Sequence, residues 1–310
     1  MARIPKRPVH GILLLDKPRG LSSNEALQAC RRVFRAAKGG HTGSLDPMAT
    51  GMLPLCFGEA TKIAGLLLGS CKAYEAECLL GVTTNTDDAE GEATVMRPVP
   101  DLDDEALREA LQQFVGHIEQ VPPAHSALKR DGVRMYERAR RGETVEIQPR
   151  GVDVHAIDWL GRDGPRLRFR VTCGSGTYIR SLARDLGEKL GCGAHLTALR
   201  RQWVDPFHEP VMVTLDALQA LSGRFNQLDR LLLPVDAGLA ELPAACLDEA
   251  QSVALQHGQP VQPASELAPG RCRAYAADGR LLALAEVRGD RRLHVVRGFH
   301  LPTPAASANP

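Results

Sequence analysis

Alternation of apolar and polar side chains predicts the strands of this chain. Between residues 74 and 80 apolar side chains alternate with glutamates, and between residues 167 and 173 they alternate with arginines. Because successive side chains of a strand point to opposite faces, both segments are predicted to be strands with one buried face. The continuous apolar runs 11–15 and 53–57 predict two further strands.

Apolar residues at helical spacing predict helices between these strands. Ser22 and Glu25 form a capping box, after which apolar side chains recur at helical spacing as far as Phe34. Further helices are expected to open at residues 58–62, to run from Asp101 or Asp103 to about Val115, and to begin near Thr177. The acidic residues 83–92 are expected to form a loop.

The character of the sequence changes after Ala240. One short helix is followed by strands that are joined at residues 278–279 and 289–290, Asp-Gly and Gly-Asp, which are typical of hairpin turns. We therefore expect an α+β domain over residues 1–246, with a mixed, largely antiparallel sheet flanked by helices. Residues 247–302 are expected to form a small β domain, and the tail 303–310 to be disordered.

Composition narrows the class of protein. The 310 residues are 44% hydrophobic and 24% charged, and no apolar run approaches the ~20 residues of a membrane span. The first ten residues are basic but lack the apolar core of a signal peptide, so we expect a cytoplasmic protein. Eight cysteines without a C-x-x-C pair favour buried thiols over a zinc site or a disulfide framework.

Charge is unevenly distributed along the chain although the net charge is only +1. Residues 1–40 contain nine Lys or Arg and two Asp or Glu, whereas residues 82–109 contain nine acids and two bases. An arginine-rich stretch at 129–141 lies in a segment, 120–150, that is expected to leave the core. This pattern is compatible with a polyanionic partner on one face. Two solvated surfaces of opposite charge would explain the charges equally well.

A single carboxylate stands out in the segment 40–51, GHTGSLDPMATG. Asp46 lies among glycines and small hydroxyls with no second acid nearby, and Pro47 disfavours a helical backbone at Asp46. The glycines allow a ligand to approach closely. We expect Asp46 to be a nucleophile, the alternative being an Asp-Pro turn without chemistry. A metal site with His41 would need more ligands than this loop supplies.

Three other residues are candidate partners of Asp46. A nucleophilic carboxylate must stay ionised, and Arg180, which follows a Gly-Ser-Gly turn, could pair with it, although a surface arginine is the alternative. Tyr74 and Tyr178 could be core tyrosines or platforms on which a base stacks. The phosphate-binding patterns G-x-x-x-x-G-K-[ST] and G-x-G-x-x-G are absent, so no nucleotide cofactor is expected.

Six segments in one order resemble the TruB family of pseudouridine synthases: GILLLDKPRGLSSNEAL, GHTGSLDPMATGMLPL, GEATK, KAY, VPPAHSALK and GTYIRSLARDLGEKLGCGAHLTALRR. The resemblance runs from Gly11 into the C-terminal β domain, which is similar to a PUA RNA-binding barrel. It implies a pseudouridine-synthase fold and a bacterial enzyme that converts uridine 55 in the T loop of tRNA to pseudouridine. Because this isomerisation involves no redox change, no metal or cofactor is expected. Nothing in the sequence demands a protein partner or more than a monomer.

The resemblance also implies roles for residues that match the family pattern. Asp46 would be the nucleophile, acting at the sugar C1′ or the base C6, and Arg180 would pair with it. Tyr74 would stack on the flipped base and assist a proton transfer. Four residues would bind the substrate: His41 would hold the extruded nucleotide, Tyr178 and Leu199 would line the base pocket, and Lys17 would support the pocket or contact phosphate.

Two positions depart from the family pattern. His125 stands where an aromatic residue is usual, and Asp205 replaces a glycine before Pro-Phe. Two alternatives stay open, namely an RNA-guided pseudouridine synthase and a non-catalytic protein that binds or folds RNA. The basic, thumb-like segment 120–150 favours a stand-alone enzyme over the first. The presence of Asp46, Tyr74 and Arg180 together argues against the second.

Overall fold

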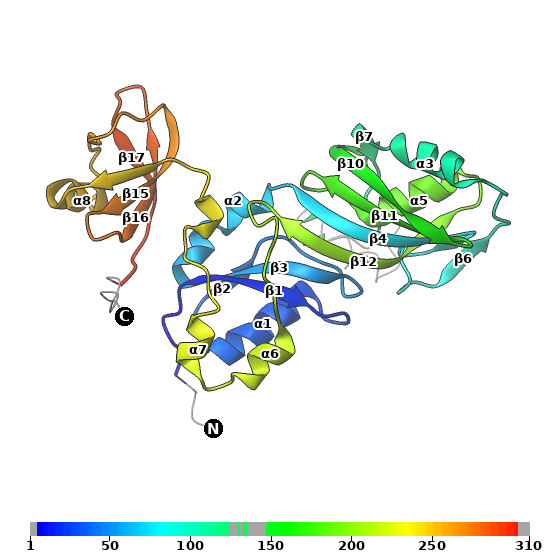
Figure 1. The fold of residues 1–310 in the computed structure, drawn as a ribbon, viewed down its shortest axis with the longest axis horizontal. Helices are drawn as coiled ribbons and strands as arrows, with labels where there is room; N and C mark the ends of the chain where they lie inside the picture. Colours follow the sequence, from blue (N-terminus) through cyan, green and yellow to red (C-terminus); the bar gives the residue numbers. More distant parts are fainter. Residues whose placement is uncertain (1–4, 125–128, 131–132, 135–146, 303–310) are drawn as a thin grey trace.

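A mixed, nine-stranded sheet forms the centre of the large domain (Figure 1). The computed structural model describes residues 5–124, 129–130, 133–134 and 147–302. The strands of the sheet are β1 (Gly11–Lys17), β2 (Gly39–His41), β3 (Thr50–Phe57), β4 (Lys72–Leu80), β7 (Gly116–Gln120), β10 (Arg150–Asp163), β11 (Arg166–Cys173), β12 (Ala194–Val204) and β13 (Val213–Thr214).

Most neighbouring strands of this sheet are antiparallel. Their order is β13-β1-β3-β12-β4-β11-β10-β7, and β2 pairs with β3. The pairs β1–β13 and β3–β12 are parallel, and the other pairs described are antiparallel. The expectation of an α+β domain with a mixed, largely antiparallel sheet is therefore confirmed.

The alternating segments are strands with one buried face, as predicted. Buried and partly exposed residues alternate along β4 and β11. On the exposed face the arginines of β11 meet the glutamates of β4: Arg170 lies 3.1 Å from Glu75, and Arg166 lies 3.2 Å from Glu77. The neighbouring strand thus balances two of the charges on the basic face of β11.

Helices cover the sheet in two groups (Figure 1). The helices of the large domain are α1 (Ser23–Phe34), α2 (Ala64–Leu68), α3 (Asp104–Gln112), α5 (Ile179–Lys189), α6 (Leu215–Ala220) and α7 (Phe225–Asp229), with the 3₁₀ turns η1 (Gly58–Lys62) and η2 (Ala237–Leu239). Helices α1, α6 and α7 lie beside β1, whereas α3 and α5 lie toward the other end of the sheet. The apolar sides of α1 and α5 share one buried cluster with strands β1, β3, β4 and β12.

Local boundaries differ from the predictions in two places. Residues 58–62 form the 3₁₀ turn η1 rather than the start of an α-helix, which begins only at Ala64. The acidic segment is not entirely a loop, because Thr83 and Thr84 belong to β5 (Val82–Thr84), which pairs with β6 (Ala93–Met96). Helix α3 is capped by Asp103, whose carboxylate accepts a 2.8 Å hydrogen bond from the backbone N–H of Ala106.

A separate four-stranded sheet follows in the C-terminal part. It consists of β14 (Ala244–Leu247), β15 (Gly270–Ala276), β16 (Leu281–Val287) and β17 (Leu293–Gly298), with helix α8 (Glu249–Gln256) packed on it. The sheet begins at Ala244, slightly before the expected domain boundary at residue 247, because β14 adds in parallel to the edge of β15. Hairpin signals do not indicate such a long-range pairing. Closure of this sheet into a barrel stays a prediction.

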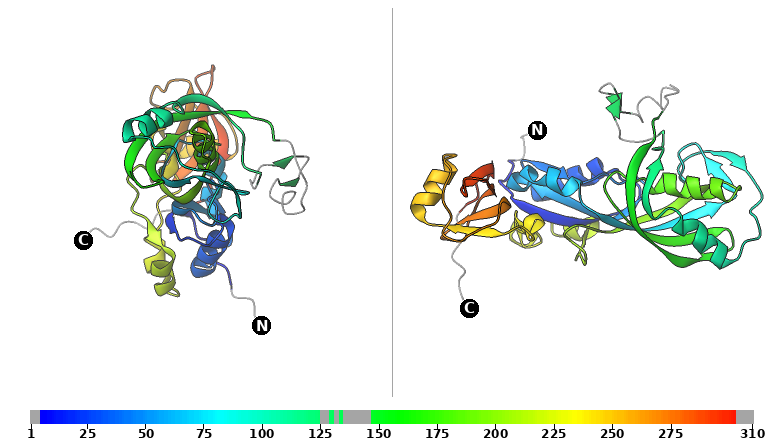
Figure 2. Two further views of the ribbon diagram at one scale, coloured as in Figure 1. Left: turned by 90° about the vertical axis from the view of Figure 1, so that its right-hand side faces the viewer. Right: turned by 90° about the horizontal axis from the view of Figure 1, so that it is seen from above.

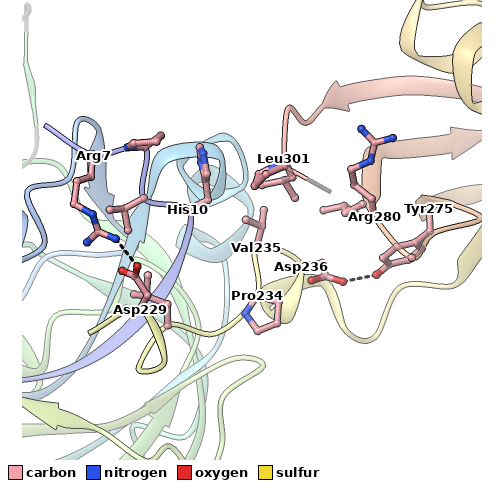
Figure 3. Close-up of a pocket in the computed structure, with 15 residues that line it drawn as sticks. Arg7, His10, Asp229, Pro234, Val235, Asp236, Tyr275, Arg280 and Leu301 are labelled. Carbon is pink, nitrogen blue, oxygen red and sulfur yellow. Dashed lines mark hydrogen bonds and ion pairs between the residues drawn. The ribbon is translucent and has the colours of Figure 1, made fainter. Parts of the chain in front are cut away.

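The small sheet lies at one end of an elongated molecule and packs against the large domain (Figure 2). Leu281, Leu284 and Phe299 share a buried cluster with Ile12 and Met52 of the large domain. A cavity of about 580 Å³ remains at this junction, and Figure 3 shows two pairs of side chains on its wall. Arg7 is ion-paired with Asp229, and the hydroxyl of Tyr275 donates a hydrogen bond to Asp236.

Part of the expected basic segment 120–150 is described. Strands β8 (Lys129–Arg130) and β9 (Val133–Arg134) pair in antiparallel fashion. The predictions for His125, for most of the arginine-rich stretch 129–141 and for the tail 303–310 lie outside the described residues.

The prediction that the cysteines are buried thiols is confirmed for most of them. All eight cysteines are free; six are buried as expected, but Cys71 is half-buried and Cys246 is exposed. Within residues 5–124 and 147–302, no three His, Cys, Asp or Glu side chains form a cluster that could hold a metal ion. Over the same residues, every helix is too short or too polar to cross a bilayer.

The capping box at the start of α1 gives a test of local stability. The hydroxyl of Ser22 accepts from the N–H of Glu25 at 3.2 Å, and the Glu25 carboxylate accepts from the N–H of Ser22 at 2.8 Å. Ser22→Ala should lower the free energy of unfolding by about 1 kcal/mol in urea denaturation. The exposed Ser265→Ala serves as a control and should change it by less than about 0.5 kcal/mol. Equal effects of the two variants would contradict the capping role.

Gly51 gives a second test, because β3 and β12 approach each other closely there. Its φ is +94°, and a Cβ at this position would lie 2.2 Å from the carbonyl oxygen of Arg201. Gly51→Ala should therefore lower the free energy of unfolding by at least about 2 kcal/mol. Gly40→Ala is the matched control, since a Cβ there meets no atom within 4 Å. If Gly51→Ala were as stable as Gly40→Ala, the close approach of β3 and β12 at Gly51 would not contribute to stability, and the prediction would be wrong.

Candidate active site

The loop that carries Asp46 connects β2 to β3, and hydrogen bonds on both sides of Asp46 hold it in place. The backbone N–H of Leu45 donates to the Ser23 hydroxyl at 2.7 Å, and that hydroxyl lies 3.1 Å from the Leu45 carbonyl oxygen. On the other side of Asp46, the Pro47 carbonyl accepts from the N–H of Gly20 at 2.8 Å. Because Leu45 and Met48 are buried, the loop rests on apolar side chains and presents Asp46 outward.

Lys17 lies beneath this loop rather than on a surface. Its side chain is fully buried, and its ammonium group donates to the carbonyl oxygens of Pro18, Leu21 and Pro47 at distances of 2.5–3.4 Å. Burial lowers the pKa of Lys17 from 10.5 to about 8, while the nearby Asp46 carboxylate opposes this change. Its three donors are thus used by carbonyl groups inside the protein, which favours support of the loop over a phosphate contact.

A cavity of about 330 Å³ brings together five of the seven residues that the sequence singled out. They come from the loop, from β4, from the start of α5 and from β12: Asp46, Tyr74, Tyr178, Arg180 and Leu199. His41 and Lys17 are not part of the lining of this cavity. Residues that are separated by up to 153 positions in the chain thus meet only through the pairing of the strands.

Arg180 links Asp46 to a second carboxylate that the sequence did not reveal. Its side chain is only 4% exposed, and its Nε lies 2.9 Å from Oδ2 of Asp46, in an ion pair. Its Nη1 lies 3.3 Å from Oδ2 of the buried Asp88 and donates to the Thr86 carbonyl at 2.9 Å. Asp88 belongs to the acidic segment 83–92, and nothing in that segment distinguished it from its acidic neighbours.

Burial and charge act in opposite directions on Asp46. Burial raises the pKa of Asp46 above 3.8 and is the largest effect, and the Asp88 carboxylate adds to it. Arg180 and Lys17 lower the pKa, as expected of cations, but do not fully offset burial. The side chain of Asp46 is 38% exposed and lines the cavity, so the carboxylate is only partly accessible to solvent.

Tyr74 and Arg201, which the sequence analysis did not identify, form another wall of the cavity. Tyr74 is 8% exposed, and burial raises the pKa of its hydroxyl above 10.0, so the hydroxyl stays protonated at neutral pH. Arg201 is fully buried and donates from Nε to the Met52 carbonyl at 2.6 Å and from Nη2 to the Gly43 carbonyl at 3.2 Å. Alternation along β12 places Arg201 on the same face as Leu199, a signal that could have identified it.

Aromatic and apolar groups complete the cavity. Leu199 is 8% exposed. The ring of Tyr178 is half-buried, and the guanidinium carbon of Arg150 lies 5.0 Å from its centroid, within the range of a cation–π interaction. His41 lies at the end of β2, and burial, followed by Arg201, lowers its pKa, which keeps the imidazole neutral. Among the described residues, its buried Nδ1 has no hydrogen-bond partner.

This arrangement suits attack by one carboxylate on a planar ligand. Asp46 is aligned by a guanidinium group, and rings and apolar side chains that could contact a flat base surround it. A second carboxylate for general acid catalysis is not available beside it, because Asp88 is buried behind Arg180. Among the described residues that line the cavity, Asp46 is thus the one carboxylate.

Comparisons with known protein families cover most of the chain, from residue 31 to residue 300. Residues 31–179 match the N-terminal domain of TruB family pseudouridylate synthase. Residues 180–240 match the C-terminal domain of tRNA pseudouridylate synthase B, and residues 242–300 match the C-terminal part of tRNA pseudouridine synthase II. The three matches are consecutive and cover both domains.

Curated relatives and solved structures agree with these matches. The chain is 58% identical to tRNA pseudouridine synthase B of Xanthomonas axonopodis pv. citri (strain 306) over 298 residues, 96% of each chain. It is 51% identical to the Burkholderia mallei (strain ATCC 23344) protein of the same name over 290 residues, 91% of this chain and 92% of that protein.

The same fold occurs in a chain of an H/ACA ribonucleoprotein bound to a substrate RNA containing 2′-deoxyuridine. The TM-score is 0.71 and the identity 23%, over 95% of this chain and 86% of the other. The motifs, the α+β fold and the full-length similarity therefore agree, and the chain belongs to the TruB family of tRNA pseudouridine synthases, which are isomerases.

Proposed function

We propose that the protein isomerises uridine to pseudouridine at position 55 in the T loop of tRNA, with Asp46 as the nucleophile. The observation that carries this proposal is the ion pair between Asp46 and the buried Arg180, at 2.9 Å, in a cavity that also contains the ring of Tyr74. The names of the relatives support tRNA as the substrate. The protein acts as a monomer without a guide RNA, a metal or a cofactor.

The target uridine must leave its stack in the T loop to reach Asp46. Extruding a base costs a few kcal/mol, which contacts inside the cavity must offset. Tyr74 provides a ring for the base to stack on, and such stacking contributes roughly 1–3 kcal/mol per base. Tyr178 and Leu199 border the same cavity, so the base lies between aromatic and apolar groups.

The chemical step replaces one glycosidic bond by another. The bond between C1′ and N1 breaks, the base turns, and a bond between C1′ and C5 forms. The hydrogen on C5 then leaves as a proton, N1 takes up a proton, and any bond to the Asp46 carboxylate is broken again. The Asp46 carboxylate divides this exchange into steps by attacking either C1′ or C6. Arg180 orients the carboxylate and favours its ionised form. Tyr74, whose hydroxyl is protonated, assists the proton transfers as a donor.

Two of the proposed substrate-binding residues act from outside the cavity. Lys17 supports the loop of Asp46 through the carbonyl of Pro47, which favours a structural role over a phosphate contact. His41 lies at the end of β2, outside the lining of the cavity, and its proposed contact is with the extruded nucleotide. The basic residues of segment 1–40 and the C-terminal domain from Ala244, which we propose to be PUA-like, would contact the RNA backbone.

Removal of the nucleophile tests the proposal directly. Asp46→Asn should lower the single-turnover rate of tritium release from tRNA labelled with [5-³H]uridine by at least about 10³-fold, because an amide cannot attack the sugar or the base. Affinity for tRNA should change little. The control Asp158→Asn removes an exposed carboxylate of β10 and should leave the rate unchanged.

The outcomes separate the alternatives. Release by the native protein alone, without a guide, and its loss when uridine 55 of the transcript is replaced by cytidine would support the assigned position. Full activity of Asp46→Asn would contradict the role of Asp46. Binding without tritium release by the native protein would favour a guide-dependent enzyme or a protein that folds RNA.

The environment of Asp46 predicts the pH dependence. A nucleophilic carboxylate is active when ionised, so the rate is lost as the pH falls through its pKa in the folded protein. Because burial raises the pKa of Asp46, the acid limb of the single-turnover rate should have an apparent pKa above the usual 3.8. Circular dichroism at each pH checks that the protein stays folded. A rate that is flat down to pH 4 would contradict this prediction.

A further inference from the structure

The side chain of Gln120 clamps the peptide backbone that precedes the site arginine. Gln120 is the last residue of β7 and is 1% exposed. Its Nε2 donates to the carbonyl of Tyr178 at 3.1 Å, and its Oε1 accepts from the N–H of Tyr178 at 2.8 Å. One amide therefore bonds both backbone groups of a residue that lies 58 positions later in the chain, and the Tyr178 carbonyl also accepts from the N–H of Leu182 at 3.1 Å.

This clamp acts at the start of α5, which has no cap of its own. Tyr178 is the N-cap residue, and its side chain forms no capping hydrogen bond. The first N–H groups of a helix have no partner within the helix. Gln120 does not cap these groups; it anchors the backbone of the residue immediately before them. Arg180 lies in the first turn, two residues after Tyr178. The position of its guanidinium group against Asp46 thus depends on how firmly this turn is held.

Neighbouring contacts connect the same turn to the place where segment 120–150 leaves the sheet. The carbonyl of Val121, the next residue, accepts from the Ser181 hydroxyl at 2.8 Å and from Nη2 of Arg184 at 2.9 Å. Arg150, where the chain returns, pairs with Gln120 in the sheet and donates to the carbonyl of Gly176. Both ends of the segment therefore contact residues 176–184.

We propose that Gln120 is a positioning residue for the isomerisation: by holding the backbone of Tyr178 it keeps Arg180 on Asp46 and the Tyr178 ring at the cavity. This inference rests on the proposed function of Asp46. A role of this kind concerns the rate of the chemical step more than the affinity for tRNA, because Gln120 is buried and does not line the cavity.

Gln120→Ala tests the role, with Gln112→Ala as the matched control. Gln112 lies at the end of α3, and its Nε2 donates to the Ile157 carbonyl at 2.7 Å, away from the cavity. Gln120→Ala should lower the single-turnover rate at saturating tRNA by about 10- to 100-fold, since small misplacements of catalytic groups have effects of this size. The Kd for tRNA should change by less than about 3-fold, and Gln112→Ala should keep the native rate.

The pH profile separates positioning from a general loss of stability. The charged groups that face Asp46 are Arg180, Lys17 and Asp88. If the turn loosens, Arg180 favours the ionised carboxylate less, so the acid limb of Gln120→Ala should move to higher pH. Gln112→Ala should leave the limb in place. A normal acid limb and a native rate in Gln120→Ala would overturn the proposal.

A second variant keeps the test decisive if Gln120→Ala does not fold. Gln120→Glu preserves the size of the side chain and the acceptor for the Tyr178 N–H, but not the donor to its carbonyl. Its rate should be below the native rate, and a native rate would overturn the inference. Failure of the proposed function itself would be recognised separately, by full activity of Asp46→Asn.

Discussion

The burial of one guanidinium group is the constraint on which the site depends. Arg180 is only 4% exposed, and a buried cation is tolerated only where opposite charges and hydrogen-bond acceptors surround it. Asp46, Asp88 and the carbonyl of Thr86 meet this requirement from two different segments of the chain. The pairing that keeps the arginine inside the protein also fixes the direction of the Asp46 carboxylate, so the stability of the fold and the geometry of the site are coupled here.

The sheet explains why these segments meet. Strands β3, β12 and β4 are neighbours, so the loop before β3, the apolar face of β4 and the middle of β12 come together at one place. The close contact between Gly51 and the backbone of Arg201 lets the parallel pair form beside the loop. Arg201 then reaches from β12 to the carbonyls of Met52 and Gly43. The loop that carries Asp46 is thus connected to the sheet by both backbone and side-chain contacts.

The electrostatic balance follows from this geometry. Arg180 stabilises the ionised form of Asp46, whereas burial and repulsion from the Asp88 carboxylate oppose ionisation. Lys17 contributes a positive charge below the loop without entering the cavity. In the proposed reaction, the carboxylate attacks in its ionised form, which Arg180 and Lys17 favour, while it is only partly exposed to water. Tyr74 stays protonated for the same physical reason, namely burial.

The sequence by itself determined the strands of alternating pattern, the capped helix α1, the choice of Asp46 and, through the order of its motifs, the family. These features depend on local periodicity, on capping and on short motifs, which neighbouring residues specify. Only the tertiary structure decided that Asp88 and Arg201 belong to the site, that Lys17 lies beneath the loop, and that β14 extends the small sheet. Such facts arise from strand pairing and burial between distant segments, which no local pattern records.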